Sequence, residues 1–483
     1  MGITIIGLGP GAIEDITLAV WRILEEADEV FLRTDQHPLL SQLPQRPTYH
    51  SFDAWYETTE SFEALYERIT TEIIRLGQRP QGVIYAVPGH PMVGERTTQL
   101  ILERAEQAKI PVKILGGLSF IEASLRALKI DGMNGLQIYD ALDLIHLYHP
   151  PINPDFPTLI GQLYSRDVAA HVKLTLMNLY PDETLVTLLH GAGTPDEKLE
   201  TVPLYEMDFS KDIAHLTTLY IPPLPYAASF EALQNVMAHL RSEVGCPWDQ
   251  EQTHESLRPQ FLEEVYEVLE AIDNGDIEAL KEELGDVLLH IVFQGQIAVE
   301  EGEFYFTEVL QHIIAKLIRR HPHVWGDVSV SGAENVVANW ETIKQQEEAT
   351  KKAEGKVARQ SLLDGVPLSL PSLVHAYRLQ ERAAGVGFDW PDVKPVIEKV
   401  IEEIEEVKAE PISQEFGDLL FAVVNWARWQ GVDPESALRE ANARFRRRFQ
   451  HIEQRANEQG RVLQDMTLEE MDALWDEAKL LGL

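Results

Sequence analysis

The chain has 483 residues and a formal net charge of −37, and this length is enough for about three domains of ordinary size. Both halves of the chain are acidic, so neither nucleic acid nor an anionic membrane surface is expected as a partner. A single cysteine, Cys246, excludes an intramolecular disulfide framework and is expected to be structural or incidental rather than a reactive thiol. The sequence after Met1 has no signal-peptide pattern and no apolar run reaches membrane-spanning length, so we expect a soluble, cytoplasmic protein.

Residues 1–222 alternate between strand and helix patterns. The expected elements are a strand at 3–6, a helix at 17–27, a strand at 29–32, and two further strand–helix pairs whose helices cover 95–108 and 121–128. This alternation predicts a largely parallel α/β sheet with glycine loops at the carboxyl ends of its strands. Such loops can line a ligand crevice; the alternative is that the glycines only permit tight turns.

Four glycine-containing segments of this region carry a family resemblance. They are GLGPG at 7–11, VPGHP at 87–91, GGLS at 116–119 and LVTLLHGAG at 185–193. Together they resemble the tetrapyrrole methylase family, which implies two α/β lobes, S-adenosylmethionine in the cleft between them, and usually a dimer. The cofactor-binding residues carried over by motif position are Gly7, Gly9, Gly11, Gly89, His90, Pro91 and Ser119. The usual Gly-Asp-Pro loop reads Gly89-His90-Pro91 here, so the role of the aspartate is not carried over, and no motif identifies a methyl acceptor.

A short linker, IPPLPY at 221–226, separates this region from a helical half. In the helical half, two amphipathic helices meet at an Asn-Gly-Asp turn signal around Gly275. Glu264 and Glu267 lie on one face of the first helix, and Glu283 and Asp286 lie on one face of the second. Because the two pairs are equidistant from Gly275, an antiparallel hairpin places all four carboxylates together.

The same arrangement recurs further along the chain. Pro411 is expected to end one helix and Ser413 to cap the next, and the carboxylates are Glu403, Glu406, Glu415 and Asp418. Converging carboxylates take up protons or demand a counter-ion, and oxygen-only ligands suit Mg²⁺ or Mn²⁺. The alternative is a solvated acidic helix face. However, the two hairpins differ in loop length, and yet in both of them the acidic pairs lie opposite each other across the hairpin. A chance acidic face would not preserve this register.

Basic and aromatic residues follow each hairpin in the same order. Lys316, Arg319 and Arg320 correspond to Arg444, Arg447 and Arg448, and Trp340 with Lys344 corresponds to Trp475 with Lys479. The helical half is therefore an internal repeat of roughly 120 residues. A metal ion held by acids beside such cations suits a polyphosphate substrate. The metal ion and the cations would both stabilise its negative charge. The tryptophan could stack on a base or belong to the core.

The spaced motifs of the helical half carry a second resemblance. EExxE followed by ExxD occurs twice, with GCPWDQEQT at 245–253 and GFDW at 387–390 ahead of the copies. From about residue 230 to the end, the chain resembles the MazG nucleoside triphosphate pyrophosphohydrolases. This implies an all-α fold whose paired subunits build four-helix bundles, and Mg²⁺-dependent hydrolysis of a nucleoside triphosphate to a monophosphate and pyrophosphate.

The resemblance also implies roles for individual residues. The metal ligands are Glu403, Glu406, Glu415 and Asp418, with Glu264, Glu267, Glu283 and Asp286 in the first repeat, and Glu402 is a further candidate for water activation. The substrate-binding candidates are Lys399, Asn425, Arg444, Arg448, Trp475 and Lys479. Lys399 and Asn425 stand where the first repeat has Gln260 and Phe293, and a cation and an amide offer more to a charged substrate. We therefore expect the second repeat to be the main catalyst.

These features predict a multidomain protein of the YabN type. Its parts would be a two-lobed tetrapyrrole-methylase-like α/β domain at 1–222 and two all-α MazG repeats at 226–347 and 366–483, in a homodimer. The favoured function is nucleoside triphosphate pyrophosphohydrolysis with Mg²⁺ or Mn²⁺, and binding of S-adenosylmethionine is expected as well. Two alternatives stay open: a methyltransferase whose helical half only dimerises it, and a nucleotide-binding sensor without turnover.

Overall fold

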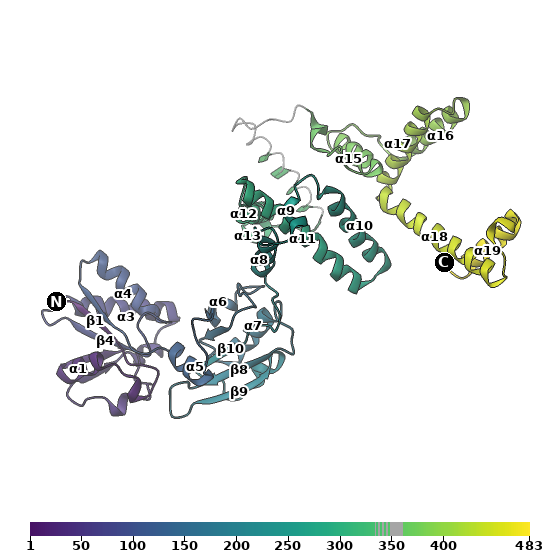
Figure 1. Cartoon of the computed structure of the whole chain (residues 1–483). Coiled ribbons are helices and arrows are strands. Elements are labelled where there is room, and N and C mark those ends of the chain that lie inside the picture. Colours follow the sequence, from purple (N-terminus) through teal and green to yellow (C-terminus); the bar gives the residue numbers. More distant parts are fainter. Residues whose placement is uncertain (334, 337–338, 341, 344–345, 348–360) are drawn as a thin grey trace. The chain divides into compact units, whose positions relative to one another are not determined.

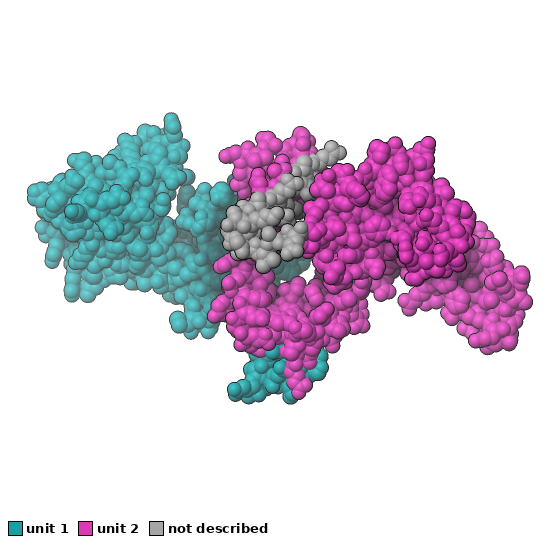
Figure 2. All heavy atoms as spheres, turned by 90° about the horizontal axis from the view of Figure 1, so that it is seen from above, with its two compact units in different colours: residues 1–250 teal, residues 251–483 magenta. Residues whose placement is uncertain are grey.

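The computed structural model describes residues 1–333, 335–336, 339–340, 342–343, 346–347 and 361–483. These residues form two compact units, Met1–Gln250 and Glu251–Leu483, which Figure 2 shows in different colours. The first unit is α/β and the second is helical, which confirms the predicted fold class. None of the described helices is long and apolar enough to cross a membrane.

The first lobe of the α/β unit is a five-stranded sheet in the order β3-β2-β4-β1-β5, and all neighbouring strands are parallel. Its elements are β1 (Ile3–Gly7), η1 (Ile13–Asp15), α1 (Leu18–Glu26), β2 (Glu29–Leu32), η2 (Leu40–Gln42), β3 (Thr48–Ser51), α2 (Asp53–Tyr56), α3 (Phe62–Gly77), β4 (Val83–Val87), α4 (Arg96–Gln107), β5 (Val112–Leu115) and α5 (Phe120–Leu128). Because successive side chains of a strand point to opposite faces, Ile5 packs with the α3 and α4 residues and Ile6 with the α1 residues. Helices therefore cover both faces of the sheet, as a buried parallel sheet requires.

The second lobe has the strand order β6-β7-β10-β8-β9, of which Figure 1 labels β10, β8 and β9. Its elements are β6 (Gln137–Asp140), α6 (Ala141–Leu144), β7 (Thr158–Gly161), α7 (Arg166–Leu176), β8 (Leu185–His190), β9 (Lys198–Pro203), η3 (Leu204–Phe209) and β10 (Thr217–Ile221). Only β6 and β7 are parallel neighbours, so the expectation of a largely parallel sheet was wrong for this lobe. A short loop makes the β8–β9 pair antiparallel, since a parallel pair needs a long crossover, and β10 pairs antiparallel with both β7 and β8.

Three glycine loops meet at the carboxyl ends of β1, β4 and β5. A Cβ atom on Gly117 would lie 2.6 Å from the carbonyl oxygen of Gly89 and 2.7 Å from that of Gly7. Gly9 has φ +79° and exchanges two backbone hydrogen bonds with Gly89, of 3.2 and 2.9 Å. Close backbone approach therefore accounts for these glycines without a ligand.

The chain then enters its helical part through α8 (Phe230–Leu240) and α9 (Pro247–Glu251). The start of α8 is tied to the second lobe, since the backbone nitrogen of Ala228 donates to Asp155 Oδ1 at 2.7 Å. Hydrogen bonds from Ser229 and Ala228 lower the pKa of Asp155. The first 240 residues thus belong to one folded unit.

The helical unit contains two antiparallel helix hairpins, α10–α11 and α16–α17 (Figure 1). Its elements are α10 (Arg258–Asn274), α11 (Ile277–Glu301), α12 (Phe306–Arg320), α13 (Pro322–Trp325), η4 (Leu362–Gly365), α15 (Ser372–Ala384), α16 (Val393–Ala409), α17 (Ser413–Trp429), α18 (Pro434–Glu458), η5 (Leu463–Asp465) and α19 (Leu468–Leu480). Helix α18 packs against α19. Lys344 and most of the connection between the repeats lie outside the described residues.

The two hairpin turns are made differently. Gly275 ends α10 with φ +67°, and the Asp276 side chain caps α11 by accepting from two backbone nitrogens at 3.1 Å. Pro411 lies in the second turn as expected, but Ser413 does not cap α17. Ile412 is the N-cap, because its extended backbone already accepts the first helical bond from Phe416 at 3.2 Å.

The crowding at the glycine loops can be tested by substitution. Gly117→Ala should lower the free energy of unfolding of the α/β unit by about 2 kcal/mol, because its methyl group meets rigid backbone oxygens. Thermal and denaturant unfolding of the full chain would measure the loss. Gly132→Ala is the matched control, since its nearest neighbour is the movable Leu125 side-chain end at 3.2 Å, and its cost should be smaller. Equal costs for the two variants would contradict this explanation.

Candidate functional site

The second hairpin brings its four acidic residues to one place. Carboxylate oxygens of Glu403, Glu415 and Asp418 lie within 4.8 Å of one another. Glu406 adjoins this group, and desolvation together with the charge of Glu403 raises the pKa of Glu406. The helical period and the hairpin turn, which place these acids opposite one another, therefore produce a concentrated negative charge.

Lys399 compensates part of this charge. Its Nζ lies 2.8 Å from Glu403 and 2.9 Å from Glu402, one turn further along α16. The hydrogen bonds to Glu403 and Glu402 raise the pKa of Lys399, so it stays charged at neutral pH. Glu403 is only 5% exposed, and its Oε2 finds no hydrogen-bond partner among the described residues. A buried, unsatisfied carboxylate oxygen beside two further acids fits a bound divalent cation.

The first hairpin has the acids without the lysine. Oxygens of Glu264, Glu267 and Glu283 lie within 4.8 Å of one another, and Gln260 stands at the position of Lys399. Desolvation and the charges of Asp286, Glu267 and Glu283 raise the pKa of Glu264, and desolvation and Glu267 raise that of Glu283. These acids also fit a cation, because a bound cation would relieve the repulsion between them.

A buried histidine distinguishes the first hairpin further. His290 lies one turn after Asp286, where the second repeat has Ala422. Its ring centroid is 5.8 Å from that of Phe261, and its buried Nδ1 has no partner in the described part of the chain. Burial lowers the pKa of His290, which keeps it neutral. The two repeats thus share acids but differ in what surrounds them.

The expected phosphate-binding residues gather on α18 and α19. Arg448 donates from Nε to the Leu483 carbonyl oxygen at 2.7 Å and lies 5.5 Å from the ring centre of Trp475. Lys479 pairs with Asp476 at 2.8 Å, and Arg444 lies 3.5 Å from Glu440. Among the described residues, no ion pair joins these three cations to the acids of α16 and α17. The predicted cations and the predicted acids are thus not paired with each other in the described residues.

Trp475 takes part in the packing of these two helices. It is half-buried, lies 5.2 Å from the Phe445 ring centre, and borders the small core of Ile452, Ala456 and Leu474. The core role considered for this tryptophan is thus present. Stacking of this ring on a base stays a prediction.

A polar network that the sequence patterns did not reveal lies beside Asn425, two turns beyond Asp418. Arg428 Nε donates to Asn425 Oδ1 at 3.0 Å, and Arg428 Nη2 donates to Asp389 Oδ1 at 2.7 Å. Trp429 Nε1 also donates to Asp389, at 3.1 Å. The sequence contains one signal for this network: when the two repeats are aligned position by position, the first repeat has none of these side chains.

In the α/β unit, loops of the two lobes touch. Cβ atoms built on Gly11 and Gly193 would lie 2.8 Å from Thr194 Cγ2 and from Pro10 Cγ, respectively. Ser119 forms a capping box with Glu122 at the start of α5. Burial opposes the ionisation of Glu122, but its hydrogen bonds with Ser119 outweigh this effect and lower its pKa. The expected cofactor-binding residues therefore lie on loops at the carboxyl ends of the first-lobe strands.

His90 differs chemically from the aspartate that it replaces. The backbone nitrogen of Met92 donates to His90 Nδ1 at 3.0 Å, so the neutral ring carries its proton on Nε2. This nitrogen faces Gly116, whose Cβ would lie only 2.7 Å away. His90 Nε2 is thus a hydrogen-bond donor at a position where an aspartate carboxylate would be an acceptor.

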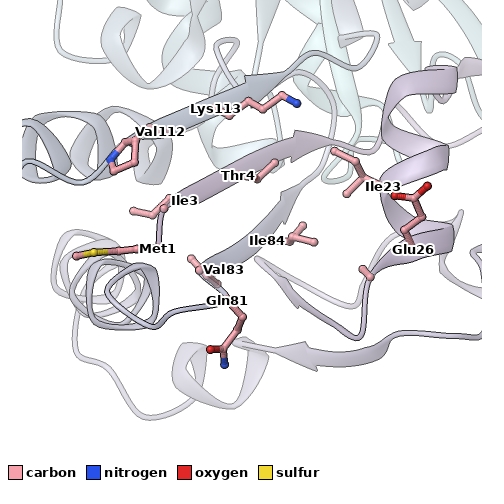
Figure 3. A pocket seen from close by; sticks show the side chains of 14 residues that line it. Met1, Ile3, Thr4, Ile23, Glu26, Gln81, Val83, Ile84, Val112 and Lys113 are labelled. Carbon is pink, nitrogen blue, oxygen red and sulfur yellow. The ribbon is translucent and has the colours of Figure 1, made fainter.

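A pocket at the opposite edge of the first-lobe sheet is shown in Figure 3. It is lined by the first residues of β1, β4 and β5, among them Ile3, Val83 and Val112. Ligands of parallel α/β sheets bind outside the carboxyl ends of the strands, where the glycine loops are. We therefore do not assign this pocket to the predicted cofactor.

Comparisons with protein families match both units. The profile of the MazG nucleotide pyrophosphohydrolase domain matches residues 252–325 and 397–453, which include all eight candidate metal ligands. The profile of tetrapyrrole (corrin/porphyrin) methylases matches residues 2–208. Each profile thus matches the part of the chain where its motifs were found.

Individual relatives agree with these matches. The uncharacterized protein YabN of Bacillus subtilis is 43% identical over 494 residues, which cover 99% of this chain and 98% of YabN. The nucleoside triphosphate pyrophosphohydrolase/pyrophosphatase MazG of Thermotoga maritima is 45% identical over 52% of this chain and 95% of its own length. The nucleoside triphosphate pyrophosphohydrolase of Escherichia coli K12 is 44% identical over 52% of this chain and 96% of its own length. One relative thus spans both units, and two span about half of this chain.

Proposed function

The chain belongs to the family that joins a tetrapyrrole methylase domain to a MazG domain, and from this premise we propose that its helical unit is a Mg²⁺-dependent nucleoside triphosphate pyrophosphohydrolase. The observation that carries the proposal is the convergence of acids on α16 and α17 around the unsatisfied Glu403 oxygen. The names of the relatives from T. maritima and E. coli support the same reaction. The boundaries 1–222, 226–347 and 366–483 are part of this proposal.

In this proposal Glu403, Glu406, Glu415 and Asp418 hold Mg²⁺, which supplies positive charge to the triphosphate. Glu402 accepts a proton from the water whose oxygen bonds to the α-phosphorus, while the bond from that phosphorus to the bridging oxygen breaks. The products are a nucleoside monophosphate and pyrophosphate. Lys399 Nζ lies 2.9 Å from Glu402 and 2.8 Å from Glu403, so it holds the Glu402 carboxylate beside the acids that would bind the metal.

The cations of α18 and α19 complete the proposed site. Arg444, Arg448 and Lys479 neutralise the charge that develops on the leaving pyrophosphate. In the described chain, no ion pair joins these cations to the acids of α16 and α17. The proposal therefore requires that α18 and α19, from the same chain or from another copy, approach the acids. We expect substrate to favour this approach, because it carries charge of the opposite sign.

The first prediction concerns the reaction itself. The full chain with Mg²⁺ should release pyrophosphate from at least one member of a panel of nucleoside triphosphates, and a metal chelator should abolish the release. Pyrophosphate and monophosphate would be measured together. Nucleotide binding without product formation would indicate a nucleotide-binding sensor instead. If neither binding nor products were detected, the remaining alternative would be a methyltransferase whose helical half only dimerises it.

The second prediction assigns the main catalyst to the second repeat. Glu403→Gln should lower kcat/KM about a hundredfold or more, if one ligand charge supplies about 3 kcal/mol to the transition state. Glu264→Gln, the matched substitution in the first repeat, should cost much less. Steady-state pyrophosphate release compares the two variants. The opposite ranking would move the main site to the first repeat.

The helical unit is further proposed to pair in a homodimer. Phe416, Leu420 and Val423 form an exposed apolar stripe along α17, at the spacing of one helix face. Such a stripe beside a metal site needs a covering surface, and a second copy supplies an equivalent one.

The third prediction tests this pairing. The wild-type chain should sediment as a dimer, and Leu420→Glu should shift it toward the monomer, because a charge in the covered stripe is costly. Leu174→Glu, at an exposed position of α7, is the control and should leave the dimer intact. A wild-type monomer whose two repeats do not touch would refute the proposal.

A second function is proposed for the α/β unit. Its methylase profile and the meeting of glycine loops from both lobes favour binding of S-adenosylmethionine near Gly89, His90, Pro91 and Ser119. These loops lie at the carboxyl ends of parallel strands, where ligands of such sheets bind. The acceptor of any methyl group is not part of the proposal.

The fourth prediction follows from that placement. S-adenosylhomocysteine should bind the full chain with saturable heat in calorimetry, and adenosine alone should bind more weakly. A crystal soaked with excess ligand should show it beside Gly89 and Ser119. If side chains fill that position and no heat is measured, the unit does not bind this cofactor.

A further inference from the structure

The network beside Asn425 connects two parts of the second repeat. Asp389 belongs to the GFDW loop before α16, whereas Asn425, Arg428 and Trp429 lie in the last two turns of α17. Arg428 bridges Asn425 and Asp389 with hydrogen bonds of 3.0 and 2.7 Å, and Trp429 donates to the same Asp389 oxygen. The Arg428 side chain is 14% exposed, and that of Asp389 is 21% exposed. The bridge is thus largely shielded from water.

The chemistry of the bridge determines the orientation of the Asn425 amide. The guanidinium Nε of Arg428 can only donate, so the atom that faces it must be the amide oxygen. The amide nitrogen, Nδ2, therefore points elsewhere, and among the described residues no acceptor binds it. Asn425 itself is 6% exposed. An amide that is nearly buried and held at its oxygen is prepared to donate one specific hydrogen bond.

The first repeat lacks every member of this network. Counted from the aspartate of ExxD, Phe293, Gln296 and Ile297 occupy the positions of Asn425, Arg428 and Trp429. Counted from the tryptophan of the upstream motif, Pro247 occupies the position of Asp389. Both repeats keep their acids, so the difference concerns recognition and not the metal-binding groups.

The position of Asn425 indicates what it contacts. It lies seven residues beyond Asp418, and two helical turns advance about 10.5 Å along the axis. A metal at the acids would hold the phosphates, so a group two turns away reaches the sugar or the base.

We propose that Asp389, Arg428 and Trp429 are positioning residues that orient the Asn425 amide to donate a hydrogen bond to an acceptor on the nucleoside part of the substrate. This inference rests on the proposed function of the second repeat. The acceptor is a base oxygen or nitrogen, or a sugar hydroxyl oxygen. The network makes the second repeat selective for nucleotides, whereas its acids alone would accept any polyphosphate.

The test measures binding by the full chain with Mg²⁺. Two probes are compared in calorimetry: α,β-methylene nucleoside triphosphates, which cannot be cleaved at the α–β position, and inorganic triphosphate, which has no nucleoside. Arg428→Gln should weaken the nucleotide analogue about tenfold and leave inorganic triphosphate unchanged, because one oriented hydrogen bond is lost. Arg428→Lys, which keeps a cationic donor, should lie between wild type and Arg428→Gln. Gln296→Ala, the matched change in the first repeat, should change neither affinity.

A double-variant cycle separates positioning from structural support. Asn425→Ala should weaken the analogue as much as Arg428→Gln does, and adding Arg428→Gln to Asn425→Ala should weaken it no further. Ribose and 2′-deoxyribose analogues with purine and pyrimidine bases distinguish a sugar acceptor from a base acceptor. The variant with Asp389→Asn provides a second reading if Arg428→Gln does not fold.

Several results would overturn the inference. Equal losses for the analogue and for inorganic triphosphate would show that the network supports the phosphate site or the fold. Additive losses in the double variant would show that Arg428 does not act through Asn425. Failure of the wild-type chain to bind any analogue or release pyrophosphate would reject the proposed function, and this inference with it. In contrast, wild-type turnover with an unaffected Arg428→Gln variant would reject the inference alone.

Discussion

Electrostatic repulsion between carboxylates held across a helix hairpin is the constraint on which the helical unit depends. Helix geometry brings Glu403, Glu415 and Asp418 within 4.8 Å of one another, and like charges at that distance need protons or a cation. The chain supplies one cation of its own, Lys399, which is bonded to Glu403 and Glu402. Within the described part of the chain, one buried oxygen of Glu403 finds no hydrogen-bond partner. A divalent ion and a polyphosphate together would satisfy what the protein leaves incomplete.

The two repeats meet this constraint in different surroundings. Where the second repeat has Lys399, Ala422 and Asn425, the first has Gln260, His290 and Phe293. Without a nearby lysine, the acids of the first repeat repel one another with less compensation, and the pKa of Glu264 is raised by desolvation and by its neighbours. Both copies thus keep the acids proposed to bind a metal, and only the second has the polar side chains around Asn425. This difference is consistent with the proposal that the second repeat is the main catalyst.

Backbone crowding is the corresponding constraint in the α/β unit. Gly7, Gly89 and Gly117 approach so closely that a Cβ atom on Gly7 or Gly117 would lie less than 3 Å from neighbouring backbone atoms. Three strands can therefore end at one point, and loops of the second lobe can reach it through Gly193 and Thr194. Glycine here serves the packing of loops first. Ligand binding at that point is a separate proposal, which the match to the methylase profile supports.

Residues close together in the sequence, or related by the helical period, made much of the molecule predictable. The positions of β1, α1, β2, β4, α4, β5 and α5, both hairpin turns and the convergence of acids follow from local periodicity and from equal distances to a turn, whereas β3, α2 and α3 were not predicted. The predicted cap of α17, Ser413, is one residue late, because Ile412 has the extended backbone of the N-cap.

Interactions between segments that are distant in the sequence could not be predicted from local periodicity. The antiparallel second sheet depends on β10 entering between β7 and β8, which no short sequence window contains. Asp389 meets Arg428 across 39 residues, because the GFDW loop folds back on the end of α17. Among the described residues, no ion pair joins the α18–α19 cations to the acids of α16 and α17, and this too is decided by how the helices pack. Local sequence specifies which side chains share a face, whereas long-range packing decides which faces meet, since that depends on the free energy of the whole fold.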